Sequence, residues 1–263
     1  MKTQWENRVT CERREAVLLV CLDRAAKLNA FDQAMLDQLV LALGDYERDP
    51  TLRCAVVLAN GENFTAGLDL AEVGDTFRVG WQLPEGAIDP WGTFGGPRLS
   101  KPLLVAAQGY CYTIGVELML AADICLCASN TRFAQLEVRR GLFPFAGATL
   151  RLPQLAGWGN AMRWLLTGDE FDAHEAYRMG LVQEVLAPEE LLPATLQLAQ
   201  RIASRSPLGI RATLASARQC LLEGEEAAAR ALPERARALL NSADAAEGLR
   251  AMQERREGDF KGH

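Results

Sequence analysis

Leu103-Leu-Val-Ala-Ala107, Val116-Glu-Leu-Met-Leu-Ala-Ala122 and Ile124-Cys-Leu-Cys-Ala128 follow one another in the middle of the chain. The first and third runs are short and apolar, which is typical of buried strands, and the run between them is expected to form a buried helix. Strands that alternate with helices favour an α/β fold with parallel strands.

The same alternation extends toward the N-terminus. Residues 16–22 and 54–59 are two further apolar runs that predict strands. Between them, apolar residues from Met35 to Tyr46 recur at helical spacing, and Asp32 is the expected N-cap of this helix. A chain of 263 residues is long enough to bury a core within one large domain.

Toward the C-terminus the pattern changes. From about Pro188 onward, strand-like runs give way to sequence rich in Ala, Leu, Glu and Arg. Ser206-Pro207 predicts a helix start, because serine caps helices and proline fits their first turn. Asp244 and Glu247 resemble a capping box, and Pro233 predicts a kink or a helix boundary just before it. We expect this helical tail to pack on its own domain or on a neighbouring subunit.

The composition excludes several classes of protein. The net charge of -6 and the pI near 5.2 argue against a nucleic-acid partner, which needs a concentrated positive surface. No apolar run reaches the roughly 18 residues of a membrane span. The seven cysteines form no CxxC pair and lie mostly in apolar runs, which indicates buried thiols in a reducing compartment. We therefore expect a soluble, cytoplasmic protein.

Common cofactor and hydrolase motifs are missing from the sequence. His174 and His263 are the two histidines, so a His-rich metal site is excluded and no metal is expected. The sequence contains no GxGxxG after a strand, no P-loop lysine and no GxSxG elbow. The sequence therefore lacks the motifs that would indicate dinucleotide binding, nucleotide binding or a serine hydrolase.

Two loops are candidates for binding negative charge through the backbone. Ala66-Gly67-Leu68-Asp69-Leu70 follows the predicted strand 54–59, and Asp69 can cap a short helix there. The second loop leads from the strand 103–107 into a helix that begins near Ile114. Helix N-termini expose unpaired N–H groups, so two such ends could converge on one oxygen. The alternative for the first loop is an ordinary junction between a loop and a helix.

Glu117 and Glu137 are the candidate acid and base residues. Glu117 is surrounded by apolar residues, where a buried carboxylate needs a partner or a purpose. For Glu137 the alternative is a surface glutamate paired with Arg139 or Arg140, and spacing alone does not bring the two glutamates together. Backbone donors near paired carboxylates suit the chemistry of a thioester enolate.

Residues 74–97 form an irregular segment rich in aromatic residues, including Trp81, Trp91 and Phe94. One interpretation is that these aromatic residues line an apolar pocket beside the candidate site. The other is that they fill the edge of the core. Loops of this length within compact domains are usually functional or disordered.

Taken together, these segments resemble the crotonase, or enoyl-CoA hydratase/isomerase, superfamily over nearly the whole chain. Residues 22–30 resemble its N-terminal signature, and residues 64–70 and 101–123 resemble its two oxyanion loops. Residues 133–147 resemble its second-glutamate segment, and residues 248–263 are similar to its tail. The resemblance implies a spiral of ββα turns that makes two near-perpendicular sheets, and a helical C-terminal region that forms a homotrimer or a dimer of trimers. It divides the chain into an acyl-CoA-binding core, 1–195, and an oligomerisation region, 196–263.

The resemblance also implies roles for single residues. The N–H groups of Leu68 and Ile114 would bind the thioester oxygen, Glu117 would act as base on the water that attacks Cβ, and Glu137 would deliver a proton to Cα. No metal or redox cofactor is required, because coenzyme A enters as part of the substrate. The residues expected to contact the substrate are Arg24, Lys27, Ala66, Gly67, Asp69, Leu70, Trp81, Trp91, Phe94, Gly115 and Phe143. Arg24 and Lys27 are expected near the CoA phosphates, with a solvated surface position as the alternative.

Hydration of a trans-2-enoyl-CoA is the expected reaction, because both glutamates of true hydratases are kept. The alternatives are another crotonase-type reaction (isomerisation, dehydration of a hydroxyacyl-CoA, or thioester hydrolysis) and a non-catalytic scaffold that binds CoA or RNA. The chain departs from the family at Thr113-Ile114, where consecutive glycines are usual, and it lacks the usual proline after Arg24. A β-branched residue resists positive φ and fills space, so the thioester pocket is expected to be reshaped.

Overall fold

The computed structural model describes residues 7–263; residues 1–6 of the predicted core lie outside this range. A six-stranded sheet has the order β1-β2-β3-β4-β6-β9. Its strands are β1 (Val9–Arg14), β2 (Val17–Leu22), β3 (Cys54–Ala59), β4 (Leu103–Ala107), β6 (Ile124–Ala128) and β9 (Glu184–Leu186). β1 and β2 pair antiparallel, and every other pair in this sheet is parallel. The predicted α/β class with parallel strands is confirmed.

A second sheet has the order β5-β7-β8, with strands Tyr110–Tyr112, Arg132–Ala134 and Phe171–Asp172. β5 and β7 are parallel, whereas β7 and β8 are antiparallel. This small sheet matters for function, because β5 lies within the second candidate loop and ends directly before Thr113 and the start of α3.

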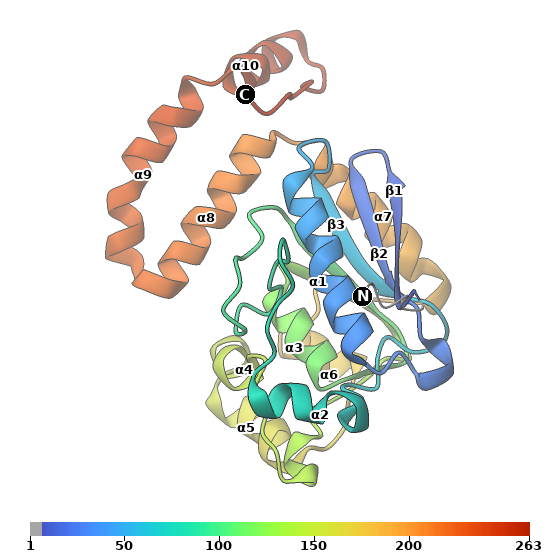
Figure 1. The fold of residues 1–263 in the computed structure, drawn as a ribbon. Coiled ribbons are helices and arrows are strands. Elements are labelled where there is room, and N and C mark those ends of the chain that lie inside the picture. Colours follow the sequence, from blue (N-terminus) through green and yellow to red (C-terminus); the bar gives the residue numbers. More distant parts are fainter. Residues whose placement is uncertain (1–6) are drawn as a thin grey trace.

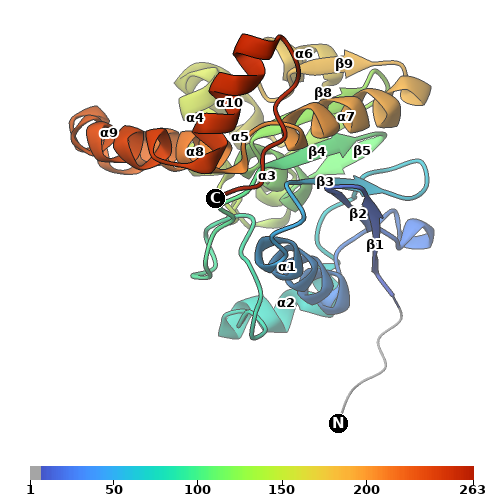
Figure 2. The ribbon, with the colours of Figure 1, turned by 90° about the horizontal axis from the view of Figure 1, so that it is seen from above.

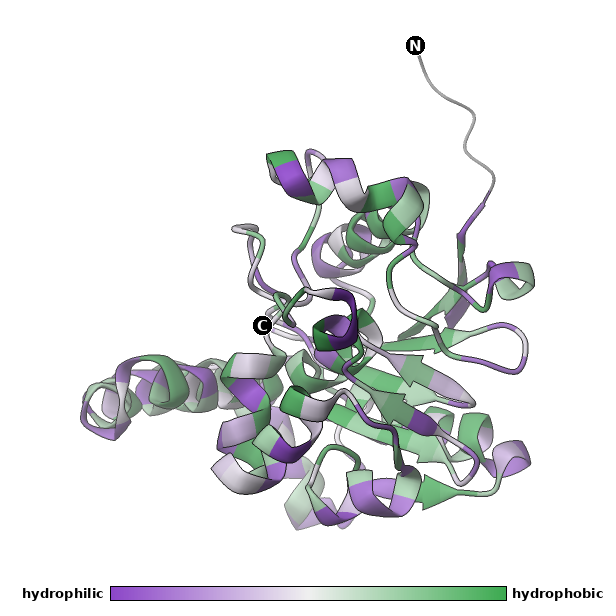
Figure 3. Ribbon diagram, turned by 90° about the horizontal axis from the view of Figure 1, so that it is seen from below, coloured by the Kyte–Doolittle hydropathy of each residue, from purple (hydrophilic) through white to green (hydrophobic). Residues whose placement is uncertain are grey.

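Helices cover both faces of the large sheet (Figures 1 and 2). Alternate residues of a strand point to opposite faces. In β3, Ala55 and Val57 face the core cluster that includes α1 (Gln33–Arg48), while Cys54 and Val56 face the cluster that includes α7 (Pro188–Ala203). Asp32 caps α1 as predicted, because its side chain accepts from the Met35 N–H. Figure 3 shows the consequence: the inner strands β2, β3, β4 and β6 are hydrophobic, the edge strand β1 is polar, and the helices are mixed.

The remaining helices surround one end of the sheet and form the C-terminal region. They are α2 (Leu70–Val79), α3 (Ile114–Ala121), α4 (Ala148–Ala156), α5 (Trp158–Thr167), α6 (Ala173–Arg178), α8 (Pro207–Glu223), α9 (Glu225–Leu240) and α10 (Ala243–Glu254), with 3-10 turns η1 (Ala25–Lys27) and η2 (Glu137–Arg140). α7 spans the predicted boundary between residues 195 and 196 and packs on the sheet along its length.

α8 and α9 lie side by side and project away from the sheet (Figure 1). No residue of α8 is buried, and Leu221, Leu222 and Leu240 are exposed. This is an apolar surface of the kind that an oligomer interface buries. The homotrimer or dimer of trimers stays a prediction.

Two expectations about helix ends in this region are wrong. α9 runs from Glu225 to Leu240 through Pro233, so the expected helix boundary before this proline is absent. α10 is capped by Ser242, whose hydroxyl accepts from the Ala245 N–H, and not by Asp244. Asp244 instead accepts from the backbone N–H groups of Lys261 and Gly262, and so holds the C-terminal segment.

Of the seven cysteines, five are buried, as predicted, while Cys11 and Cys220 are exposed; all seven are free. Within residues 7–263, no helix has the length and apolar character required to cross a membrane.

Candidate functional site

The two candidate loops lie against each other. The Thr65 N–H donates to the Tyr110 carbonyl at 2.8 Å, and the Tyr112 N–H donates to the Thr65 carbonyl at 3.0 Å. Gly115 allows this close approach, since a Cβ at that position would lie 2.4 Å from the Thr65 Cγ2. The backbone therefore brings residues 65–68 next to the start of α3.

The N–H groups of Leu68 and Ile114 are available as donors. Among residues 7–263, neither N–H donates to a protein acceptor, although those of Gly67, Asp69 and Thr113 do. Ile114 is the first residue of α3, whose early N–H groups lack partners within the helix. The predicted pair of backbone donors is thus present at adjacent loops.

Asp69 stands at the N-cap position of α2, but its side chain makes no capping hydrogen bond, contrary to the expected capping role. Its carboxylate pairs instead with the Arg24 guanidinium at 2.8 Å. Arg24 also contacts Asp32 at 3.2 Å, and its side chain is only 10% exposed. This geometry favours a structural role for Arg24, in which it anchors the first loop, over the expected phosphate contact and over the solvated alternative.

Glu117 lies in the first turn of α3 and is 2% exposed. Its Oε1 accepts from the N–H groups of Ala146 at 2.8 Å and Ala148 at 3.1 Å. Burial raises the pKa of this carboxyl to about 7, and these N–H groups oppose the rise without cancelling it. A carboxyl with a pKa near neutrality can exchange protons at physiological pH.

Glu137 begins the 3-10 turn η2 and is 8% exposed. Glu137 is buried and makes no ion pair within residues 7–263, while Arg139 pairs with Asp169, so the alternative of a surface glutamate paired with Arg139 or Arg140 is wrong. Burial raises the pKa of Glu137 to about 7, and the negative charge of Glu117 adds to the rise. With its amide nitrogen turned toward this carboxylate, the buried Gln135 donates to both carboxylate oxygens at 3.0 Å.

A cavity of about 20 Å³ joins these groups. It is lined by Leu68, Leu70, Thr113, Ile114, Glu117, Glu137, Arg140, Leu142 and Phe145. The four residues predicted to be catalytic therefore share one small space. Its volume matches the space that one water molecule needs.

The aromatic segment lies behind this cavity. Trp81 and Trp91 are buried, and the Trp91 indole N–H donates to the Ile114 carbonyl at 3.2 Å. Phe94 packs against both tryptophans. None of the three lines the cavity between the glutamates, so their predicted contact with substrate is not made there. Trp91 supports Ile114 through its hydrogen bond, and Trp81 and Phe94 pack against Trp91.

The other expected substrate contacts fall in different places. Leu70 lines the cavity beside Leu68, and Gly67 is buried against Thr113. Ala66 donates its N–H to the Leu28 carbonyl. Lys27 and Phe143 are exposed on the surface, and their contact with substrate stays a prediction.

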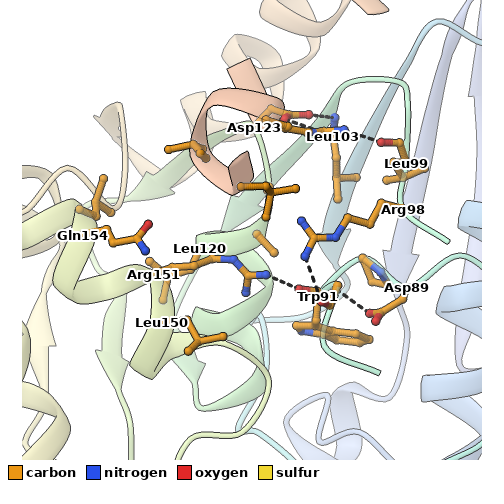
Figure 4. Close-up of a pocket in the computed structure, with 18 residues that line it drawn as sticks. Asp89, Trp91, Arg98, Leu99, Leu103, Leu120, Asp123, Leu150, Arg151 and Gln154 are labelled. Carbon is orange, nitrogen blue, oxygen red and sulfur yellow. Dashed lines mark hydrogen bonds and ion pairs between the residues drawn. The ribbon is translucent and has the colours of Figure 1, made fainter. Parts of the chain in front are cut away.

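A larger cavity of about 610 Å³ lies between α3, α4 and α8 (Figure 4). Arg151 projects into it from α4 and donates to the carbonyls of Trp91 and, at 3.3 Å, Ala146. Arg151 thus bonds the carbonyl of the same residue, Ala146, whose N–H holds the Glu117 carboxylate. Neither Arg151 nor the Ala146 N–H could be predicted from the sequence, since no motif or spacing marks them.

The chain is similar to known proteins over nearly its whole length. The family model for enoyl-CoA hydratase/isomerase matches residues 12–263. The 2,3-dehydroadipyl-CoA hydratase of Escherichia coli is 34% identical, with 95% of this chain and 97% of the relative covered. The carnitinyl-CoA dehydratase of Citrobacter koseri is 33% identical, with 95% and 97% covered. A solved structure from Mycobacterium abscessus, described as a probable enoyl-CoA hydratase/isomerase, is 49% identical with a TM-score of 0.95 and covers 98% of this chain and 99% of its own.

Proposed function

Since the chain belongs to the enoyl-CoA hydratase/isomerase family, whose enzymes act on CoA thioesters, we propose that it adds water to a trans-2-enoyl-CoA to give a 3-hydroxyacyl-CoA. One observation carries the proposal. Two buried carboxyl groups, both with a pKa near 7, face one small cavity together with two unpaired backbone N–H groups.

The N–H groups of Leu68 and Ile114 bind the thioester oxygen in the proposed reaction. Attack at Cβ moves an electron pair onto this oxygen and forms an enolate, so donors already aimed at it stabilise the transition state more than the substrate. Loss of one such donor typically costs about 2.7–4 kcal/mol. The donors are held in place by Arg24 through Asp69 on one loop and by Trp91 on the other.

The two carboxyl groups move the protons. Glu117, ionised, takes a proton from the bound water as its oxygen forms the bond to Cβ. Glu137, protonated, gives its proton to Cα as the enolate collapses. The water supplies the hydroxyl at Cβ, and one proton passes from water to Glu117 while another passes from Glu137 to Cα. Both carboxyl groups face one cavity, so the two additions occur on the same side of the double bond.

We expect a bell-shaped dependence of kcat/KM on pH, with its maximum near neutrality. Below the maximum, protonation of Glu117 removes the base, and above it, ionisation of Glu137 removes the acid. Because the two groups interact, the apparent pKa values belong to the pair. Initial rates measured between about pH 5 and pH 9 test this; a rate that stays level across that range contradicts it.

An ultraviolet assay with a short trans-2-enoyl-CoA tests the reaction itself. Hydration removes the absorbance of the conjugated enoyl thioester and leaves the CoA bound to a 3-hydroxyacyl group. A shifted double bond identifies isomerisation, and free CoA identifies thioester hydrolysis; either as the main product contradicts the proposal. Dehydration of a 3-hydroxyacyl-CoA is the reverse of the same steps, and the assay run from that side measures it.

A further inference from the structure

Thr113 is held in a backbone conformation that disfavours its own side chain. It stands at the N-cap of α3 with φ 47° and ψ -112°. Positive φ is an outlier for β-branched residues, and such strain concentrates at functional sites. The chain nevertheless has a threonine where glycine would remove the strain.

The Thr113 hydroxyl is buried without a partner. The residue is 5% exposed, and its Oγ1 has no hydrogen bond to any atom of residues 7–263. The backbone of Thr113 is satisfied, since its N–H donates to the Ala134 carbonyl and its carbonyl accepts from the Glu117 N–H. A buried hydroxyl without a partner destabilises the fold, and a valine of the same shape would avoid that cost.

The position of this hydroxyl relates it to both backbone donors. A Cβ built on Gly67 would lie 2.2 Å from the Thr113 Oγ1, so the hydroxyl rests against Gly67. Leu68 follows Gly67 and Ile114 follows Thr113, so the hydroxyl lies beside the two peptides that carry the available N–H groups. Thr113 also lines the cavity that both glutamates face.

We propose that the Thr113 hydroxyl is a third hydrogen-bond donor to the thioester oxygen, acting beside the N–H groups of Leu68 and Ile114. This inference rests on one part of the proposed function, namely that the site binds a CoA thioester; it does not require that the reaction is hydration. The incoming oxygen gives the hydroxyl the acceptor that it lacks in the free protein. The donor works most strongly on the enolate, because hydrogen bonds to charged oxygens are stronger than those to neutral ones. Thr113 is then a catalytic residue of this chain.

Thr113→Val tests the proposal, because it keeps the shape and the β-branching and removes only the hydroxyl. We expect kcat/KM for hydration to fall by about a hundredfold, the loss typical of one oxyanion donor. Thr113→Ser keeps the hydroxyl and is expected to stay within a few-fold of the unsubstituted enzyme. Equal rates for Thr113→Val and the unsubstituted enzyme overturn the proposal.

A vibrational measurement separates this proposal from the proposed reaction. The carbonyl band of a bound saturated thioester, butanoyl-CoA labelled with ¹³C at the carbonyl, moves to lower frequency when donors polarise the bond. We expect a smaller shift in Thr113→Val than in the unsubstituted protein and in Thr113→Ser. The measurement needs no turnover, so absence of hydration would refute the proposed reaction while the band still tests Thr113.

Thr131 supplies the matched control. It is also buried, but its hydroxyl donates to the Ala107 carbonyl at 3.0 Å and it does not line the cavity. Thr131→Val is expected to lower thermal stability and to leave the carbonyl band unchanged. A band that is identical in Thr113→Val and the unsubstituted protein, or one that moves equally in Thr131→Val, overturns the proposal.

Discussion

Glu117→Gln is expected to lower kcat for hydration by about a thousandfold, because the amide cannot take the proton of the attacking water. The Gln Oε1 can still accept from the N–H groups of Ala146 and Ala148, so the fold and the binding of CoA thioesters are expected to persist. Stopped-flow measurement of the enoyl absorbance gives kcat, and calorimetry with a saturated acyl-CoA gives the affinity. Near-normal turnover in this variant contradicts the role of Glu117.

Thermal unfolding shows whether the Glu117→Gln protein is folded. The direction in which the substitution changes stability is also predicted, and it depends on pH. The pKa of Glu117 is raised from 4.5 to about 7 in the folded protein. Between these values the folded state binds more protons than the unfolded state, so stability falls as pH rises and is lowest above pH 7. Above pH 7, the ionised Glu117 lowers the free energy of unfolding by roughly 3 kcal/mol. The variant is therefore expected to be more stable than the unsubstituted protein at pH 8 and to lose this advantage near pH 4.

Glu137→Gln is expected to reduce hydration by a similar factor, because it removes the proton donor for Cα. A second measurement distinguishes the two roles. In D₂O, a base near Cα exchanges the α-protons of a bound saturated acyl-CoA without any attack by water at Cβ, and proton NMR follows this exchange. We expect Glu137→Gln to lose the exchange and Glu117→Gln to retain most of it.

Glu226→Gln serves as the control for both glutamates, because Glu226 is exposed and pairs with Arg230 on α9, far along the chain from the site. It is expected to leave hydration and exchange unchanged. The reverse pattern of exchange, lost in Glu117→Gln and kept in Glu137→Gln, would assign the two roles the other way round.

The long apolar runs made the large sheet predictable from the sequence. Strands 54–59, 103–107 and 124–128 appear with their predicted bounds, because an apolar run with a turn signal at each end defines a buried strand. The three strands of the small sheet were not predicted, since they have two or three residues each and no periodicity to detect. Their pairing depends on the rest of the fold.

The candidate site was predictable only in part. Resemblance to a family located Glu117, Glu137 and the two N–H groups, whereas spacing could not place the glutamates near each other. The interactions that tune them come from distant segments: the Ala146 N–H, the Gln135 amide and the Arg151 guanidinium. The resemblance places Arg24 near the CoA phosphates, and the sequence does not reveal that its guanidinium pairs with Asp32 and Asp69.

A crystal structure with a bound saturated acyl-CoA tests the central claim most directly. We expect the thioester oxygen to lie about 2.7–3.1 Å from the N atoms of both Leu68 and Ile114, with one water held between the carboxyl groups of Glu117 and Glu137. A thioester oxygen turned away from these N–H groups, or carboxyl groups too far apart to hold the same water, would contradict hydration at this site.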